Sequence, residues 1–511
     1  MEDSLHADLP RGRSDNRPGV SPDSAFIPTS ELAASQDLRF GPGKHFLGIV
    51  NGTVLEAEYE GRRDVFCTGG TPIGIHDDRH FMLICGTRGG KSRAAIVPVL
   101  LTYGGSDVDS GSVLAVDPKG ELANLTAKRR HEMGQQIHIL DPYGITDEAL
   151  KEHRAVFNPM AMIEDPISET RVEDAGLIAD AIVVREEQGR DPHWDESARM
   201  LLETLILHVA TAPQYEGRRD LVTVFKILAV MNDSIREEME LNSAGDFAVE
   251  EGAHAFFDRP DKERDSVLSS ARRHARFLGY PQMRSVLCGK SIDLHELKTR
   301  KTTIYLCLPA MRLGTCSRWL RMFVNATLAA LEQETTKPKL PVLLCLDEFA
   351  VMGRLQKIEE AAAALAGFSV RLWVILQDLT QLQALYKERW ETFLGNAGVI
   401  QCFGNSDLTT LKWISERLGQ AMVRTETEEP VPYHLRVEQG TTGIKVSMNV
   451  QALMTPEEVS RFFGRDDPLL RQLIIMPGRA PIILQRAFHD KHELFKPAPA
   501  PKKGLASFPN R

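Results

Sequence analysis

The sequence predicts an α/β protein in which a mostly parallel sheet carries helices on both faces and is interrupted by an inserted all-helical domain. Three observations lead to this prediction. Short, continuous apolar runs recur along the chain and alternate with segments of helical spacing. A glycine-rich turn that ends in Lys91 and Ser92 follows one of these runs. Between residues 166 and 287, amphipathic helical patterns replace the apolar runs.

The apolar runs have the length and composition of strands that are buried on both faces of a sheet. Polar residues follow most of them at the carboxyl ends of the strands, where parallel sheets bind their ligands. The runs after the glycine-rich turn are Val113–Val116, Ile137–Leu140, Thr303–Leu308, Val342–Leu346, Leu372–Leu376 and Val399–Phe403. The polar residues that follow them are Asp117, Asp141, Asp347, Glu348, Gln377, Asp378 and Asn405.

The glycine-rich turn has the order of a phosphate-binding loop. Backbone N–H groups of such a turn point toward an anion, and the dipole of the helix that follows favours negative charge. Lys91 would reach the outer phosphates of a nucleotide, and the Ser92 hydroxyl would hold Mg²⁺. The alternative is an ordinary glycine-rich turn before Lys-Ser. The candidate nucleotide-binding residues are Gly86, Thr87, Arg88, Gly89, Gly90, Lys91 and Ser92.

One position departs from the usual pattern of this loop. Cys85 stands where the first glycine is expected. A small side chain is tolerated there if the local backbone has a negative φ.

The run Val342–Leu346 ends in Asp347 and Glu348, which suits a Walker B element. Asp347 would orient Mg²⁺, and Glu348 would polarise the water that attacks the γ-phosphate. Gln377 ends the next run and would contact the γ-phosphate or that water. The alternative for Gln377 is that it satisfies backbone groups where a strand ends.

The chain divides by composition into four parts. Residues 1–45 form a polar, mostly disordered arm, and residues 496–511 form a flexible tail. The nucleotide-binding domain comprises residues 46–165 and 288–495, with the all-helical domain at 166–287 inserted. Inside that domain, we interpret the basic cluster at residues 272–276 as a solvated helix face rather than as a contact with nucleic acid.

Composition bounds the class of protein. A net charge of −9 excludes a uniformly basic nucleic-acid-binding surface. No apolar run approaches the roughly 18–20 residues that span a bilayer, and the polar N-terminus lacks a signal-peptide pattern. The seven cysteines form no C-x-x-C pair, and no His/Cys spacing indicates zinc. We therefore expect a cytoplasmic protein.

Taken in order, the motifs resemble those of the TraG/VirD-type coupling ATPases of type IV secretion and conjugation. Cys85–Ser92 is similar to the family's phosphate loop, and Asp117–Leu122 reads D-P-K-G-E-L as in the family. Leu346–Phe349 resembles its Walker B segment, and Leu376–Leu379 its sensor segment. The D-P-K-G-E-L and sensor segments are the most specific parts of a resemblance that extends over residues 45–490.

This resemblance implies a RecA-like P-loop NTPase core that uses ATP and Mg²⁺, in a homo-hexameric ring. It implies delivery of single-stranded DNA with its relaxase, or of effector proteins, to the components of a type IV secretion channel. Family members commonly begin with transmembrane helices. Since this sequence shows none, we expect docking through a partner or peripheral contact at the inner face of the bacterial inner membrane.

Some members carry an arginine before the sensor strand that acts across the subunit interface. The corresponding stretch Ala364–Phe368 has none, so Arg88, Arg354 and Arg371 are candidates, each with an equally plausible structural role. The role of Lys119 in the D-P-K-G-E-L segment also stays open.

Two other functions fit the same motifs. One is a nucleotide-gated recruitment adaptor that binds ATP with little hydrolysis. The other is a motor of the FtsK/HerA type that acts on double-stranded DNA. A steady-state assay of phosphate release distinguishes the adaptor from a motor. A comparison of the stimulation by single- and double-stranded DNA distinguishes the FtsK/HerA-type motor from a coupling ATPase.

Overall fold

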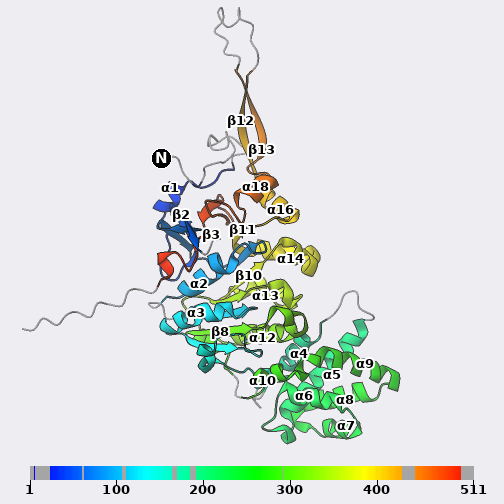
Figure 1. Ribbon diagram of the computed structural model, residues 1–511. Coiled ribbons are helices and arrows are strands. Elements are labelled where there is room, and N and C mark those ends of the chain that lie inside the picture. The colour runs from blue at the N-terminus through cyan, green and yellow to red at the C-terminus, as the bar shows by residue number, and fades with distance from the viewer. Residues whose placement is uncertain are drawn as a thin grey trace, which may run out of the picture.

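The computed structural model describes residue 5 and residues 24–59, 62–105, 111–163, 170–184, 192–289, 292–428 and 444–496. An 11-stranded sheet with the order β4-β1-β15-β14-β11-β5-β10-β9-β6-β8-β7 forms the core (Figure 1). Its parallel part is β5 (His80–Cys85), β6 (Val113–Asp117), β7 (Gln136–Leu140), β8 (Thr302–Cys307), β9 (Val342–Leu346), β10 (Val370–Leu376) and β11 (Ala397–Phe403). Each predicted run lies within or overlaps one of these strands, and every residue of β5, β9, β10 and β11 is buried.

Helices cover both faces of this sheet. The connections β5–α2–β6 and β6–α3–β7 advance along the sheet in one direction, whereas β8–α12–β9 and β9–α13–β10 advance in the other. Because parallel crossovers are right-handed, the two groups of helices lie on opposite faces. The helices of this part are α2 (Val97–Thr102), α3 (Glu121–Glu132), α11 (Glu296–Thr299), α12 (Leu313–Gln333), α13 (Gln356–Leu365), α14 (Leu379–Tyr386), α15 (Trp390–Gly395), α16 (Leu408–Leu418) and α18 (Pro456–Phe462).

An antiparallel flank extends the sheet beyond β11, and sequence patterns did not predict it. It consists of β1 (His45–Val50), β4 (Thr71–Ile75), β14 (Arg471–Ile475) and β15 (Ile482–Gln485). Strands from the two ends of the chain meet here, and such pairings leave no local signal. Two separate ribbons, β2 (Thr53–Tyr59) with β3 (Arg62–Thr68) and β12 (Gln420–Glu428) with β13 (Ile444–Ala452), complete the strands described.

Part of the predicted N-terminal arm is ordered. Residues 24–45 include helix α1 (Thr29–Ala34), and Leu32 and Leu38 are buried. The backbone N–H of Phe40 donates to the carbonyl of Pro72 in β4 at 2.9 Å. Residues 24–45 thus depart from the prediction of a mostly disordered arm over residues 1–45, because apolar side chains there pack on the antiparallel flank. Except for Leu5, residues 1–23 lie outside the described residues, as do residues 497–511 of the tail.

Residues 171–287 fold into helices that stand beside one end of the sheet (Figure 1). Helix α5 is the centre of this group, since α4, α6, α8 and α9 all pack on it, and α4 also packs on α12 of the sheet part. The helices are α4 (Arg171–Ile182), α5 (Pro192–Thr211), α6 (Leu221–Ala229), α7 (Asp233–Glu240), α8 (Asp246–Phe257), α9 (Asp261–Ala275) and α10 (Pro281–Leu287). Across the described residues of the chain, no helix is both long and apolar enough to cross a membrane.

The basic cluster of α9 lies on a solvated helix face, as predicted, except for His274, and it also makes tertiary contacts. His274 is fully buried, and its Nε2 lies 2.9 Å from Asp195 Oδ1 on α5. Arg273 pairs with the same carboxylate at 2.9 Å. The Arg272 guanidinium donates to the carbonyls of Leu228 and Ala229 at the end of α6. The cluster therefore joins three helices, which the spacing of its residues did not indicate.

The central strands should dominate the stability of the sheet. Leu344 on β9 is fully buried, whereas Leu125 on α3 is 43% exposed. Leu344→Ala should lower the free energy of unfolding by about 3 kcal/mol because it leaves a cavity. Leu125→Ala should change it by less than about 0.5 kcal/mol. Denaturant midpoints measured side by side test this, and equal shifts would contradict burial of β9 on both faces.

Candidate active site

The carboxyl ends of three neighbouring strands form the candidate site. β10 lies between β5 and β9 and is parallel to both. In this register Leu376 is paired with Ile84, and Val374 with Leu346. The loop after β5, the acidic pair after β9 and the glutamine after β10 therefore emerge at one edge of the sheet.

The loop after β5 is shaped by close backbone contacts. A Cβ atom on Gly86 would lie 2.0 Å from the carbonyl oxygen of Gly404, which follows β11. Gly90 has a φ of +87°, a conformation that side chains disfavour, and Arg88 adopts a φ of +58°. Ser92 begins a π-helical turn, η2 (Ser92–Ile96), that leads into α2. Wide turns of this kind are frequent at functional sites.

Cys85 is accommodated as the last residue of β5. Its extended backbone does not need glycine, and its side chain is fully buried. Burial raises the pKa of the thiol to about 12, so the thiol stays protonated at neutral pH. A Cβ on Gly89 would lie 2.6 Å from Cys85 Sγ. The thiol thus takes up space inside the loop, which makes glycine necessary at position 89.

Lys91 joins the loop to the acidic pair. Its Nζ lies 2.7 Å from Asp347 Oδ1 and 2.5 Å from Glu348 Oε1. Burial acts to lower the pKa of Lys91, but the two carboxylates outweigh burial and raise that pKa above its ordinary value. Lys91 is therefore a charged ammonium held by two acids.

Gln377 connects the other side of the acidic pair back to the loop. Its Nε2 donates to Glu348 Oε2 at 3.1 Å, and its Oε1 accepts from the Thr87 hydroxyl at 3.0 Å. Both carboxylate oxygens of Glu348 are thus engaged, one by Lys91 and one by Gln377. Glu348 also has a φ of +53°, a strained conformation for a non-glycine residue. The side chain of Gln377 bonds two side chains of the site, so it does more than satisfy backbone groups.

The D-P-K-G-E-L segment forms the turn after β6, next to β9. The buried carboxylate of Asp117 accepts from the backbone N–H groups of Lys119 at 3.3 Å and Ala123 at 2.9 Å. Burial raises the pKa of Asp117 to about 6, although these N–H donors oppose the shift. Gly120 has a φ of +69° in this turn. Asp117 therefore shapes the turn and starts α3, while Lys119 is exposed at the same edge of the sheet.

The structure removes one of the three candidate arginines. Arg371 lies at the start of β10, at the opposite end of the strand from Gln377. Its side chain is buried and its guanidinium lies 4.7 Å from the ring centroid of Phe81. Burial in the sheet prevents it from reaching a neighbouring molecule.

The other two candidates are at the surface. Arg354 pairs with Glu359 at 2.9 Å, and Arg389 pairs with the same carboxylate at 3.1 Å. Arg88 is exposed on the loop itself. Because Arg354 and Arg389 share the single carboxylate of Glu359, these three side chains carry a net positive charge.

A buried arginine that sequence reasoning missed holds the loop from behind. The Arg486 guanidinium donates to four backbone carbonyls, those of Gly89 at 3.4 Å, Leu470 at 3.3 Å, Gly464 at 3.2 Å and Arg465 at 3.1 Å. Burial lowers the pKa of Arg486. The only local feature in the sequence that could have indicated this role is that an arginine directly follows the apolar strand β15. Only the fold shows that this arginine faces the loop.

Oxygen ligands for a divalent cation are available at this edge. One is the hydroxyl of Ser92, the first residue of the helical turn after the loop. The other is the carboxylate of Asp347, which contacts the ammonium of Lys91. Among the residues that the structure describes, no cluster of three or more His, Cys, Asp or Glu side chains could hold a metal alone. A cation bound here would therefore share its coordination with oxygens of a bound phosphate.

Comparisons with known proteins find relatives of one family. A family model described as Type IV secretory system Conjugative DNA transfer matches residues 48–506. The type IV secretion system-coupling protein VirD4 of Bartonella quintana (strain Toulouse) is 24% identical over 421 residues, which are 80% of this chain and 62% of that protein. The conjugal transfer protein TraG of Escherichia coli is 26% identical over 407 residues, 75% of this chain and 62% of TraG. The chain thus spans less than two thirds of the length of these relatives.

Solved structures share the fold. The plasmid coupling protein TrwB in complex with ADP and Mg²⁺ is similar with a TM-score of 0.60 and 18% identity, over 88% of this chain and 96% of that one. TrwB in complex with the GTP analogue GDPNP has a TM-score of 0.59 at the same identity, over 88% and 97%. The predicted RecA-like P-loop NTPase fold with its mostly parallel sheet is confirmed.

The contact between Gly86 and Gly404 should control the shape of the loop. Gly86→Ala places a methyl group against a backbone carbonyl, so the loop must move, at an expected loss of about 1–3 kcal/mol in stability. Gly41→Ala is the matched control, since a Cβ there meets nothing within 4 Å. Hydrogen exchange of residues 86–92 together with thermal melting tests this. Unchanged exchange in Gly86→Ala would show that the loop is not held there.

Proposed function

Because the chain belongs to the type IV secretory family of conjugative DNA-transfer coupling proteins, we propose that it is an ATP-hydrolysing motor. It recruits single-stranded DNA with its relaxase, or effector proteins, and delivers them to a type IV secretion channel. The observation that carries the proposal is the contact of Lys91 with Asp347 and Glu348 at the edge where Gln377 links Glu348 to the loop. These are the parts that phosphoryl transfer to water requires at one place.

ATP and Mg²⁺ are the proposed ligands of this edge. TrwB, which has the same fold, was solved with ADP and Mg²⁺ and with a non-hydrolysable ATP analogue. In this chain the backbone of residues 86–90 and Lys91 would hold the phosphates, and Ser92 and Asp347 would hold the metal ion. A metal ion bound there neutralises charge on the phosphate oxygens. The acidic pair already contacts a cation, the ammonium of Lys91, which supports a site that favours positive charge.

The residues of the chain have separate tasks in hydrolysis. An arriving triphosphate competes with the carboxylates for the Lys91 ammonium and draws it toward the phosphate oxygens. Glu348 Oε1 is then released from Lys91 and accepts a hydrogen bond from the attacking water. Gln377 keeps its bond to Glu348 Oε2 and so orients the carboxylate while Thr87 fixes the amide.

Delivery requires that the site act on the rest of the molecule. The turn η9 (Phe349–Met352) directly follows Glu348 and packs on α12, which in turn packs on α4. A displacement of the acidic pair therefore has a contiguous route to the all-helical residues 171–287. We place the protein in the cytoplasm, in peripheral contact with the inner membrane, as a homo-hexamer that presents these helices to cargo.

Two substitutions separate binding from hydrolysis. Lys91→Ala should abolish both nucleotide binding and turnover, since it removes the charge that holds the outer phosphates. Glu348→Gln should keep nucleotide binding but lower phosphate release by about 10²–10⁴-fold. Lys128→Ala and Glu132→Gln on α3 are matched controls, because both side chains are exposed away from the site. Turnover that survives both site variants would refute the motor.

The cargo is tested by stimulation of phosphate release. Single-stranded DNA should raise the steady-state rate several-fold, and the effect should weaken with salt because phosphate contacts are ionic. Stimulation by cognate effector protein instead of DNA would assign protein cargo. Greater stimulation by double-stranded DNA would favour the FtsK/HerA-type motor. Tight binding of ATP without release of phosphate would favour the recruitment adaptor.

A further inference from the structure

The helix after the phosphate loop begins with an irregular turn that leaves one carbonyl without a donor. In an α-helix the N–H of Val97 would donate to the carbonyl of Arg93, but here it donates to the carbonyl of Ser92. The next residue along the helix, Pro98, has no N–H to offer in its place. The carbonyl of Arg93 therefore needs a donor from outside its own helix.

A short stretch near the end of the described chain supplies that donor. The backbone N–H of His489 donates to the carbonyl of Arg93 at 3.1 Å. The carboxylate of Asp490 accepts from the guanidinium of the same arginine, at 2.8 Å from Nε and 2.7 Å from Nη2. This guanidinium also lies 4.2 Å from the ring centroid of Phe488. We call residues 486–490 the strap, since they hold Arg93 by both its main chain and its side chain.

The strap also holds the phosphate loop on the other side of Lys91 and Ser92. Its first residue, Arg486, donates to the carbonyl of Gly89 at 3.4 Å. Lys91 and Ser92 lie between Gly89 and Arg93, the two points of the main chain that the strap contacts. Because one short stretch fixes both flanking positions, it restricts the orientation of the residues between them.

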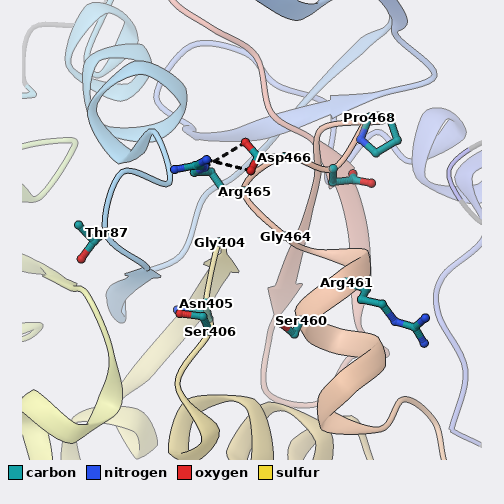
Figure 2. A pocket seen from close by; sticks show the side chains of 11 residues that line it. Thr87, Gly404, Asn405, Ser406, Ser460, Arg461, Gly464, Arg465, Asp466 and Pro468 are labelled. Carbon is teal, nitrogen blue, oxygen red and sulfur yellow. Dashed lines mark hydrogen bonds and ion pairs between the residues drawn. The ribbon is translucent and has the colours of Figure 1, made fainter.

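The strap is anchored to the turn after α18. The Arg486 guanidinium donates to the carbonyls of Gly464 at 3.2 Å and Arg465 at 3.1 Å. Figure 2 shows this turn on one side of a cleft of about 510 Å³ and Thr87 of the phosphate loop on the other. The strap therefore bridges the loop and a part of the chain that lies across the cleft from it.

A second anchor comes from the ribbon of β2 and β3. Asp64 of β3 accepts from the Arg93 guanidinium at 2.9 and 3.0 Å. Lys491, directly after the strap, pairs with the same carboxylate at 3.1 Å. Figure 1 shows the red end of the chain beside this blue ribbon. The charge of Arg93 is thus held between two aspartates, Asp64 and Asp490, from segments near opposite ends of the chain.

We propose that the strap positions the Ser92 hydroxyl for Mg²⁺. This role rests on the proposed function, in which Ser92 and Asp347 hold the metal ion. Ser92 is the first residue of the irregular turn and Arg93 directly follows it, so the direction of the hydroxyl depends on how that turn is closed. Arg93, His489 and Asp490 are therefore positioning residues, which act on the metal ion only through Ser92.

Nucleotide binding with and without the metal ion tests this role. His489→Pro removes the N–H that the Arg93 carbonyl accepts, and His489→Ala is the matched control because it keeps that N–H. Calorimetry on the full chain would compare the Kd for ADP in excess Mg²⁺ with the Kd for ADP in a chelator. His489→Pro should weaken binding of Mg-ADP about tenfold or more and leave the Kd for metal-free ADP within about twofold. His489→Ala should leave both values within about twofold.

A second variant acts through the side chain and introduces no proline. Asp490→Ala removes the carboxylate that fixes the guanidinium, so it should lower the gain in ADP affinity from Mg²⁺ by about tenfold. Asp37→Ala is its control, because it breaks an ion pair of 2.7 Å to Arg479 that joins the segment after α1 to the connection between β14 and β15. Thermal melting of each variant shows whether it is folded.

A double-mutant cycle shows whether the effect passes through Ser92. Ser92→Ala removes the hydroxyl, so by itself it should lower the gain in affinity from Mg²⁺. In that background Asp490→Ala should cause no further loss, because the group that the strap positions is gone. Losses that add would show that the strap does not act through Ser92 and would overturn the inference.

Two other results would also overturn it. Equal weakening of ADP with and without Mg²⁺ would show that the strap supports the loop as a whole. Unchanged binding in both His489→Pro and Asp490→Ala would show that the turn needs no support. Failure of the proposed function looks different, because then the unmodified protein would bind no ADP or would gain no affinity from Mg²⁺.

Discussion

The contact of Lys91 with Asp347 and Glu348 is the constraint on which the site depends. It joins segments that precede and follow the whole all-helical part of the chain. The partly buried Lys91 and Glu348 and the buried Asp347 compensate one another, because a charge withdrawn from water without a partner loses its hydration without compensation. The pairing is achieved by placing β10 as the single strand between β5 and β9, so that all three strand ends meet.

The same contacts restrain the side chain of Glu348. Both oxygens of Glu348 are engaged, and its backbone has a φ of +53°. A carboxylate in that condition is positioned but not free, and in the proposed mechanism a phosphate that attracts Lys91 would release one oxygen. Strain that collects at one residue next to a charged network is typical of a site that changes when its ligand binds.

The loop is supported by parts of the chain that are far from it in sequence. Gly404 after β11 packs against Gly86, and Arg486 after β15 bonds Gly89. The antiparallel flank is therefore part of the site as well as an extension of the sheet. Arg486, directly after β15, places one buried cation behind the loop, and a cleft on the side of β11 is lined by Thr87 of the loop, by residues 404–406 after β11 and by residues from the end of α18 to Pro468.

The sequence by itself determined the local elements: the buried runs of the parallel strands, the loop that ends in Lys91 and Ser92, and the polar residues after each strand. These are short-range patterns, in which burial on both faces and the backbone requirements of a turn select residue types directly. Tertiary structure decided what depends on neighbours. Arg486, the burial of Arg371 and His274, the antiparallel flank and the cleft follow from which strands and helices lie side by side. A charged residue has the same local spacing whether it faces water or a backbone carbonyl, so only the fold distinguishes the two.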